Sequence, residues 1–352
     1  MFGSISVQKR VDFANNLAVM LRSGITINES LGYIAEQEKS NTFKKTLYEL
    51  KEELERGTAL SEAFERKVNT FGDVFVSFLK AGEVSGRLEE NLLFLSSWLE
   101  RNNDLKRAIS SALLYPKIII AGTSVLGILI TFLLLPRFVS IFESVDVELP
   151  ITTKFMLGFM TFTRDNWLWI LIAAIVLFVA YKFISRFKKF KRFMQWAQIR
   201  LPILGNIILT YHIAVVTQIF SSLFQSGLSI SEIINVAARG APTIQYRESI
   251  EQIGERIFAG VSISEALGDF PALYPKNFIN IVHIGEKSGT LDDSFQYLSD
   301  FYSKDVFNRT RNLPTILEPL LLFFVGIVVG LLAFSVIFPM YKMISELGTI
   351  AR

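Results

Sequence analysis

Two glutamates in a repeated turn are the residues of this chain whose type and spacing best suit recognition chemistry. Glu83 lies in Gly-Glu-Val-Ser-Gly-Arg-Leu (82–88), and Glu286 lies in Gly-Glu-Lys-Ser-Gly-Thr-Leu (285–291). A carboxylate on such a turn can reach a partner protein or a cation, whereas the glycines give the backbone freedom to end a helix. The sequence therefore predicts either a partner-binding site or a structural turn, formed by Gly82, Glu83, Gly86, Gly285, Glu286 and Gly289.

Other side chains that commonly carry catalysis or bind metals are scarce. There is no cysteine, and the two histidines are His212 and His283. Each is expected to be an isolated surface or half-buried side chain rather than a ligand. The sequence contains no Gly-Lys-Ser/Thr step of a P-loop and no Gly-x-Ser-x-Gly elbow. We therefore predict no catalytic residue, no metal site and no cofactor, and we do not expect an enzyme.

The elements that carry the turn occur twice, at a fixed offset of 203 residues without a gap. Gly24 is matched by Gly227, the turn at 82–88 by the turn at 285–291, and Pro116 by Pro319. Self-similarity at a fixed offset indicates two copies of one structural unit. At this offset both histidines align with lysines of the first copy, so neither histidine is common to the two copies.

The polar part of each copy has the spacing of helices. Phe13, Leu17 and Leu21 follow one helical face, and no alternating strand pattern with a hairpin signal stands out. Thr26 with Glu29, and Ser229 with Glu232, have the pattern of a capping box. Glycine and asparagine breakers leave room for about six helices in each copy, and each Gly-Glu-x-Ser-Gly turn is expected to close one helix and open the longest.

Three apolar stretches are candidates for membrane spans, and 51% of the 352 residues are hydrophobic. Charge-free runs cover 118–136, 166–181 and 319–341, and a span needs about 20 apolar residues. The middle run is short, so a buried core helix is its alternative. The expected fold is an all-α membrane protein with two repeated cytoplasmic six-helix-type bundles and three transmembrane helices.

The distribution of lysine and arginine predicts the orientation. These residues are more numerous before the first run, after the second and before the third, which places the N-terminus and both bundles in the cytoplasm. The expected segments are domain 1 (1–116), a span (117–136), an extracytoplasmic connector (137–165), a span (166–184), domain 2 (185–318), a span (319–341) and an extracytoplasmic tail (342–352).

Inside the apolar runs the sequence predicts helix packing rather than ion transport. Gly326 and Gly330 form a Gly-x-x-x-Gly pair, and Gly127 stands at the position of Gly330 in the first copy. No ionisable residue lies within any run, although pumps and proton relays usually need one. The basic run 187–193 follows a span directly, so it is expected to bind membrane lipids and not nucleic acid.

These motifs together resemble a known family. Two helical units with Ser-Glu-Ala at 61–63 and 264–266, and with the Gly-Glu-x-Ser-Gly-x-Leu turn, are similar to the inner-membrane platform proteins of type IV pili and type II secretion, the PilC/GspF family. The resemblance covers the chain from about residue 8 onward. It implies a platform in the cytoplasmic (inner) membrane that docks a hexameric cytoplasmic assembly ATPase and couples its motion to pilin or pseudopilin helices. Other machine components and further copies of the chain are implied partners.

A second function class stays open beside this interpretation. A long apolar chain can also be a subunit of a membrane transporter or channel. The lack of charge within the runs and the small number of spans argue against it. Ion flux through liposomes would distinguish the two classes.

Overall fold

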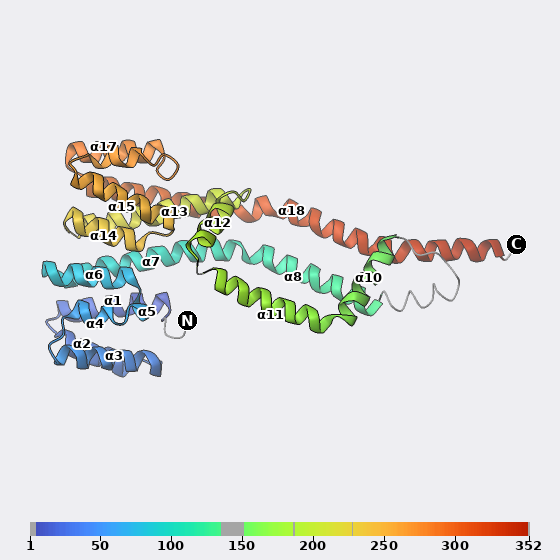
Figure 1. The fold of residues 1–352 in the computed structure, drawn as a ribbon, viewed down its shortest axis with the longest axis horizontal. Helices are drawn as coiled ribbons and strands as arrows, with labels where there is room; N and C mark the ends of the chain where they lie inside the picture. The colour runs from blue at the N-terminus through green and yellow to red at the C-terminus, as the bar shows by residue number, and fades with distance from the viewer. Residues whose placement is uncertain (1–4, 135–150, 186, 227, 351–352) are drawn as a thin grey trace. The chain divides into compact units, whose positions relative to one another are not determined.

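The structure is a computed structural model and describes residues 5–134, 151–185, 187–226 and 228–350 (Figure 1). The chain divides into two compact units. Unit 1 comprises Met1–Ile109 with Gln195–Arg309, and unit 2 comprises Ser110–Met194 with Thr310–Arg352. Both helical repeats therefore belong to unit 1, and the apolar runs belong to unit 2.

Each repeat in unit 1 is a bundle of helices, and the described residues contain no strand. The first repeat consists of α1 (Val7–Arg22), α2 (Ile27–Gln37), α3 (Asn41–Glu55), α4 (Leu60–Glu65), α5 (Val68–Phe71), α6 (Asp73–Ser85) and α7 (Leu88–Ala112). The second consists of α13 (Leu204–Gln225), α14 (Ile230–Gly240), α15 (Ile244–Phe258), α16 (Ile263–Gly268), α17 (Lys276–Ser288) and the start of α18 (Leu291–Ile350). The single-turn α5 has no helical counterpart, and the other six correspond in order.

The second helix of each repeat begins at a capping box. The amide of Glu29 donates to Thr26 Oγ1 over 3.3 Å, and the Glu29 carboxylate accepts from the Thr26 amide over 3.1 Å. Ser229 and Glu232 make the same two bonds at 3.3 and 3.0 Å. Each box satisfies N–H groups that have no partner within the helix, and both were predicted from the sequence. Their presence at equivalent positions is consistent with one design used twice.

Aromatic side chains fill the core of each bundle. In the first repeat Phe13, Phe64, Phe71 and Phe75 are at most 2% exposed, and their ring centroids lie 4.7–6.0 Å apart. Phe278, the equivalent of Phe75, is likewise buried in the second repeat. Burying each such ring contributes roughly 1.5–3 kcal/mol, so these clusters are a main source of stability in unit 1.

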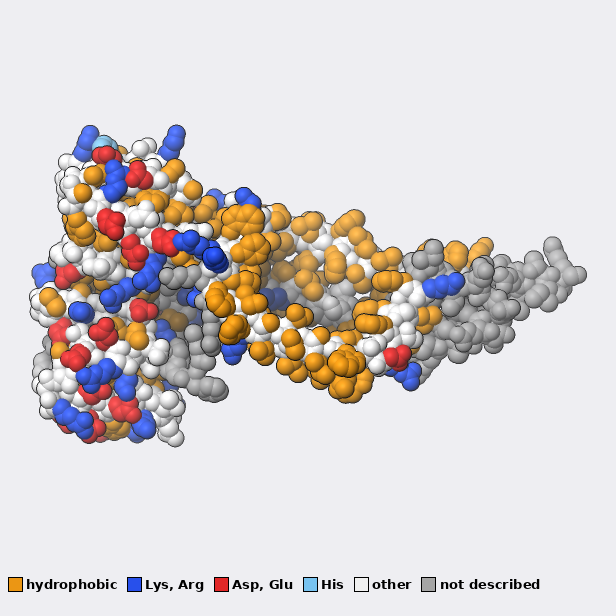
Figure 2. All heavy atoms as spheres, in the orientation of Figure 1, with side chains coloured by type: hydrophobic (Ala, Val, Ile, Leu, Met, Phe, Trp, Pro, Cys, Tyr) orange, Lys and Arg blue, Asp and Glu red, His pale blue; other side chains and the backbone are white. Residues whose placement is uncertain are grey.

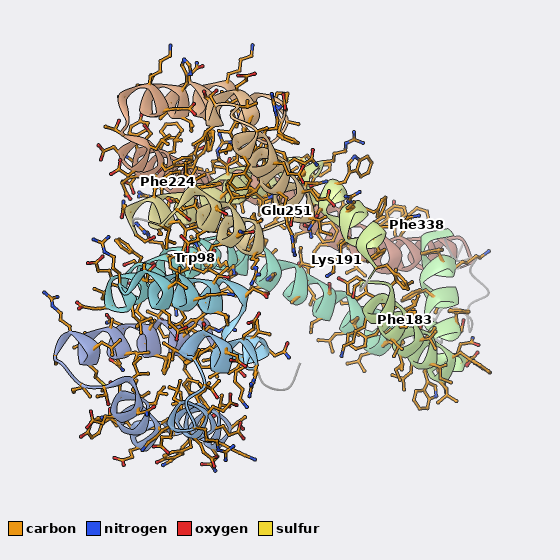
Figure 3. All side chains as sticks on the ribbon, turned by 60° about the vertical axis from the view of Figure 1, so that its left-hand side comes forward. Trp98, Phe183, Lys191, Phe224, Glu251 and Phe338 are labelled. Atoms are coloured by element: carbon orange, nitrogen blue, oxygen red, sulfur yellow. The ribbon has the colours of Figure 1, made fainter. Side chains whose placement is uncertain are left out.

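The two repeats pack against each other through α6 of the first and α14 of the second. Arg101 on α7 donates to Ser222 on α13 over 3.3 Å, and the Tyr211 hydroxyl donates to Asn102 over 3.2 Å. Residues of both repeats form one continuous hydrophobic core. In the turned view of Figure 3, Trp98 marks the first repeat and Phe224 the second within this unit.

Unit 2 contains helices whose apolar side chains face outward (Figure 2). Its elements are α8 (Leu114–Leu129), the π-helix η1 (Ile130–Leu134), α10 (Ile151–Asp165), α11 (Trp167–Ile184), part of α12 (Lys188–Ile199) and the rest of α18. The helix α10 was not predicted and occupies the second half of the expected connector. Residues 137–150 of that connector lie outside the described residues.

Four helical stretches among the described residues are long and apolar enough to cross a membrane: Leu88–Leu133, Trp167–Ile184, Leu204–Gln225 and Leu291–Phe334. The four stretches differ in burial. In Leu204–Gln225, 78% of the most apolar 18-residue segment is buried inside the protein, whereas the buried share in each of the other three is 6% or less. We interpret Leu204–Gln225, which is α13, as a core helix. Each of the remaining three overlaps one of the apolar runs found in the sequence. The chain is an all-α membrane protein.

Candidate functional site

The Gly-Glu-x-Ser-Gly turn joins two helices in each repeat, as the sequence predicts. α6 ends at Ser85 and α17 at Ser288, and each is followed by a glycine in the left-handed region, with φ of +69° at Gly86 and +75° at Gly289. α7 and α18 then begin at Leu88 and Leu291, with two acidic residues in the first turn of each. A residue with a side chain would be strained at these glycines, so the fold itself requires them.

Each glutamate of the turn binds the beginning of another helix. The Glu83 carboxylate accepts from the backbone N–H groups of Leu60 and Ser61 over 2.7 and 2.9 Å. Leu60 and Ser61 are the first residues of α4, where N–H groups have no partner within the helix. A carboxylate here satisfies two such groups and also interacts favourably with the helix dipole.

Glu286 repeats this arrangement at the beginning of α16. Its carboxylate accepts from the N–H groups of Ile263 and Ser264 over 2.5 and 3.1 Å, and from the Ser264 hydroxyl over 2.7 Å. The two sites occupy equivalent positions in the two repeats. Sequence reasoning placed the glutamates on a turn but did not connect them to helices that begin much earlier in the chain. The Ser-Glu-Ala motif was the sequence signal that could have indicated this contact, because its serine is the second N–H donor in each copy.

The hydrogen bonds set the protonation state of both carboxylates. Burial by itself raises the pKa of Glu83, but hydrogen bonds from Ser61 and from the amide of Leu60 outweigh it and hold the pKa below its ordinary value. The same balance of burial against bonds from Ser264 and Ile263 lowers the pKa of Glu286. Both groups are therefore ionised at neutral pH, as a helix cap requires.

Close packing explains the first glycine of each turn. A Cβ built on Gly82 would lie 2.9 Å from the Cα of Leu88, and one on Gly285 would lie 2.1 Å from the Ser294 hydroxyl oxygen. Neither position has room for a side chain, because α6 and α17 approach the following helices too closely. Backbone conformation, close packing and helix capping thus give each of the six predicted residues a structural role. A role for them in binding a partner remains a prediction.

Ser264, His283 and Glu286 lie together but do not form a catalytic triad. The Ser264 hydroxyl contacts His283 Nδ1 over 3.0 Å and also donates to Glu286. In a triad the histidine bridges the serine and the acid, whereas here the acid binds the serine and the backbone. Among the described residues, no group of three or more His, Asp or Glu side chains could hold a metal ion.

The other histidine is more deeply placed than the sequence suggested. His212 on α13 is 8% exposed, and its ring lies 6.1 Å from that of Tyr246. Burial lowers the pKa of His212 to about 4, so the side chain is neutral at physiological pH. Its position inside α13 explains why a surface or half-buried environment was the wrong expectation.

The glycines predicted to pack helices in the membrane have open surroundings. Apart from the chain neighbours and the nearby backbone of the same helix, no described heavy atom lies within 4 Å of a Cβ built on Gly127, Gly326 or Gly330. Each of these positions is therefore open within the described part of one chain. Their expected contact with another helix remains a prediction.

Comparison with known proteins agrees with the repeat and with its offset of 203 residues. The family model described as "Type II secretion system (T2SS), protein F" matches twice, over residues 13–136 and 216–339. The two matches start at equivalent positions of the two copies found in the sequence, and both contain the Gly-Glu-x-Ser-Gly turn. Together they cover more than half of the chain, so the protein belongs to this family.

Individual relatives come from both kinds of machine. The chain is 29% identical to the type IV pilus assembly protein PilC of Thermus thermophilus over 96% of its own length and 82% of the relative's. It is 25% identical to the PilC protein of Pseudomonas aeruginosa, with 96% and 89% covered. The type II secretion system protein F of Xanthomonas campestris is also 25% identical, with 96% and 83% covered.

Proposed function

We propose that this protein is the inner-membrane platform of a type IV pilus-like or type II secretion machine. The observation that supports the proposal most is the double family match, which covers most of both bundles and most or all of two apolar runs. Relatives named for pilus assembly and for type II secretion match nearly the whole chain. The role is structural and mechanical, and no catalytic step is assigned to any residue.

In this proposal the bundles of unit 1 dock a hexameric cytoplasmic assembly ATPase and pass its motion to pilin or pseudopilin transmembrane helices. The charged surface of unit 1 suits contact with a water-soluble partner (Figure 2). The outward-facing apolar side chains of α8, α11 and α18 suit lipid and other transmembrane helices. The basic segment beginning at Phe187 would lie against anionic lipid headgroups.

The experiment that tests this function uses the full-length chain in its native host. We expect deletion of the gene to abolish surface pili or type II secretion, and the full-length chain to restore it. A tagged chain should co-purify with an assembly ATPase and a pilin-like subunit from detergent extracts. Unchanged pili and secretion in the deletion strain would contradict the proposal.

The proposed topology places residues 1–117 and 182–318 in the cytoplasm and the connector outside. The chain has no cysteine, so single cysteines can be introduced at the exposed positions Asn41, Lys154 and Gln252. In intact spheroplasts we expect an impermeant maleimide to label only Lys154→Cys, because the other two positions face the cytoplasm. All three should react after permeabilisation. Labelling of Gln252→Cys with protection of Lys154→Cys would refute the orientation.

A further inference from the structure

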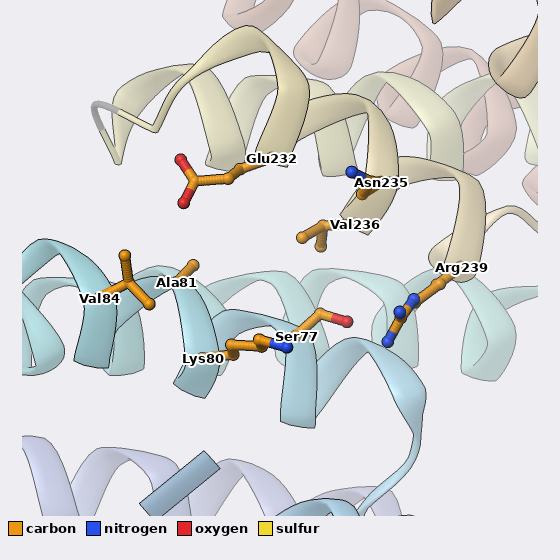
Figure 4. Close-up of a pocket in the computed structure, with 8 residues that line it drawn as sticks. All are labelled: Ser77, Lys80, Ala81, Val84, Glu232, Asn235, Val236 and Arg239. Atoms are coloured by element: carbon orange, nitrogen blue, oxygen red, sulfur yellow. The ribbon is translucent and has the colours of Figure 1, made fainter. Parts of the chain in front are cut away.

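The contact between the two repeats joins two different faces of the repeated unit. α6 of the first repeat packs against α14 of the second, and Figure 4 shows Ala81 and Val236 facing each other across this contact. In the order of the repeat, α14 is the equivalent of α2 and α6 is the equivalent of α17. Among the described residues, the α17 face of the second repeat and the α2 face of the first repeat therefore have no matching partner. Figure 1 draws α17 and α2 at opposite ends of unit 1.

The residues at the centre of these two faces are large, apolar and exposed. In the contact between the repeats, Ala81 is 5% exposed and Val236 is 6% exposed. Their equivalents are Ile284 on α17, which is 65% exposed, and Tyr33 on α2, which is 51% exposed. Each free face therefore presents a larger apolar side chain at the position that is buried where the repeats meet.

α1, which precedes α2, also exposes an apolar side chain at a position that is buried in its equivalent helix, α13. Ser222 on α13 is fully buried where it accepts a hydrogen bond from Arg101 of the other repeat. Its equivalent on α1 is Val19, which is 53% exposed. The face formed by Val19 and Tyr33 is thus apolar at two positions that are covered in the second repeat.

The charges on the two free faces are complementary. The α2 face carries the exposed acids Glu29 and Glu36, whereas the α17 face carries the exposed Lys287. Figure 4 places Val84 and Glu232 at the same end of the contact between the repeats. These positions correspond to Lys287 and Glu29, so an equivalent contact would bring the lysine toward the acid.

We propose that copies of this chain associate head to tail, with the α17 face of one copy on the α2 face of the next. Such a contact is heterologous, because it joins two different surfaces, and it generates a ring if the rotation closes and a filament if it does not. The contact between the repeats within each copy is its geometric template. This inference goes beyond the proposed function, because it assigns the surface through which copies of the chain meet and does not require an ATPase.

Crosslinking between copies tests the proposal directly. Two differently tagged full-length variants, Tyr33→Cys and Ile284→Cys, are co-expressed and treated in membranes with a short bis-maleimide. We expect a mixed product that carries both tags, and no product when either variant is expressed alone. Tyr48→Cys with Phe258→Cys is the matched control, because both are exposed aromatic positions outside the two faces, on α3 and α15. Crosslinking of either single variant alone would indicate a symmetric contact and overturn the proposal, as would the absence of the mixed product.

A charged substitution provides a second measurement. Ile284→Lys should weaken self-association of the purified protein about tenfold or more, because it places a charge where an apolar side chain would be buried. Phe258→Lys changes a side chain of similar exposure away from the faces and should leave association unchanged. Thermal unfolding midpoints of both variants should equal that of the original protein, since both positions are exposed. Equal association of the two variants would overturn the proposal.

Discussion

Replacing Glu83 by alanine is expected to destabilise unit 1 by about 2 kcal/mol, because two N–H groups of α4 lose a charged acceptor. The residue before α4, Ala59, has no side chain that could cap the helix in its place. The thermal midpoint of the purified chain should fall by roughly 5 °C, and the amides of Leu60 and Ser61 should exchange hydrogen faster. Glu65→Ala at the other end of α4 is the matched control and should have little effect, because Glu65 is exposed.

The second repeat should respond less to the same change. Ser262 before α16 accepts a hydrogen bond from the amide of Glu265 over 3.2 Å, so α16 keeps a local cap when Glu286 is replaced. We expect Glu286→Ala to cost about 1 kcal/mol, roughly half the effect of Glu83→Ala. Equal costs in the two repeats would contradict this account of the caps.

The effect of Glu83 should depend on pH in a defined direction. The pKa of Glu83 in the folded protein lies below the ordinary value of 4.5. Its contribution to the free energy of unfolding is therefore fully present above pH 4.5 and is lost as the pH falls through the folded-state pKa. The stability difference between the original protein and Glu83→Gln should therefore be constant near neutral pH and shrink below about pH 4.5. If the Glu83→Gln variant is present at the normal protein level and still supports pilus assembly or secretion, the glutamate stabilises the fold and does not bind a partner.

Helices and capping boxes were accessible to sequence reasoning because each depends on local spacing. Thr26 and Glu29 are close neighbours in the chain, and the hydrogen bonds between them follow from helix geometry alone. The repeat is visible because its offset never changes. The left-handed glycines at the two turns follow similarly, since Gly86 and Gly289 stand directly after a helix.

The function of Glu83 and the burial of His212 depend on distant parts of the chain. Glu83 binds the start of α4. In the sequence, α5 and most of α6 lie between these two sites, so no local pattern predicts the contact. α13 is as apolar as a membrane span, yet its surface is covered by its own repeat and by α7 of the other. Composition alone cannot separate such a core helix from a span, because both remove apolar side chains from water.

Replacing Gly285 by alanine is the other change with a large expected effect, a destabilisation of about 2–3 kcal/mol from overpacking. The added Cβ would lie 2.1 Å from the Ser294 hydroxyl oxygen, 2.8 Å from the Ser294 Cβ and 3.0 Å from the carbonyl oxygen of Thr290. Rotation of the serine could relieve the first contact but not the other two, so α17 and α18 must move apart at the turn. Chemical or thermal unfolding of the full chain measures the cost.

A second substitution at Ser294 separates overpacking from a general intolerance of the turn. Because two of the three close contacts are with the Ser294 side chain, Ser294→Gly should recover more than half of the stability lost in Gly285→Ala, measured as a double-mutant cycle. Gly268→Ala is the control, because Gly268 ends α16 with no atom within 4 Å of the added Cβ and no left-handed backbone. Alanine there should be neutral or stabilising by up to about 1 kcal/mol. Additive effects of Gly285→Ala and Ser294→Gly would show that the two residues do not share the contact, and the close approach of α17 to α18 would then not be the reason for the glycine.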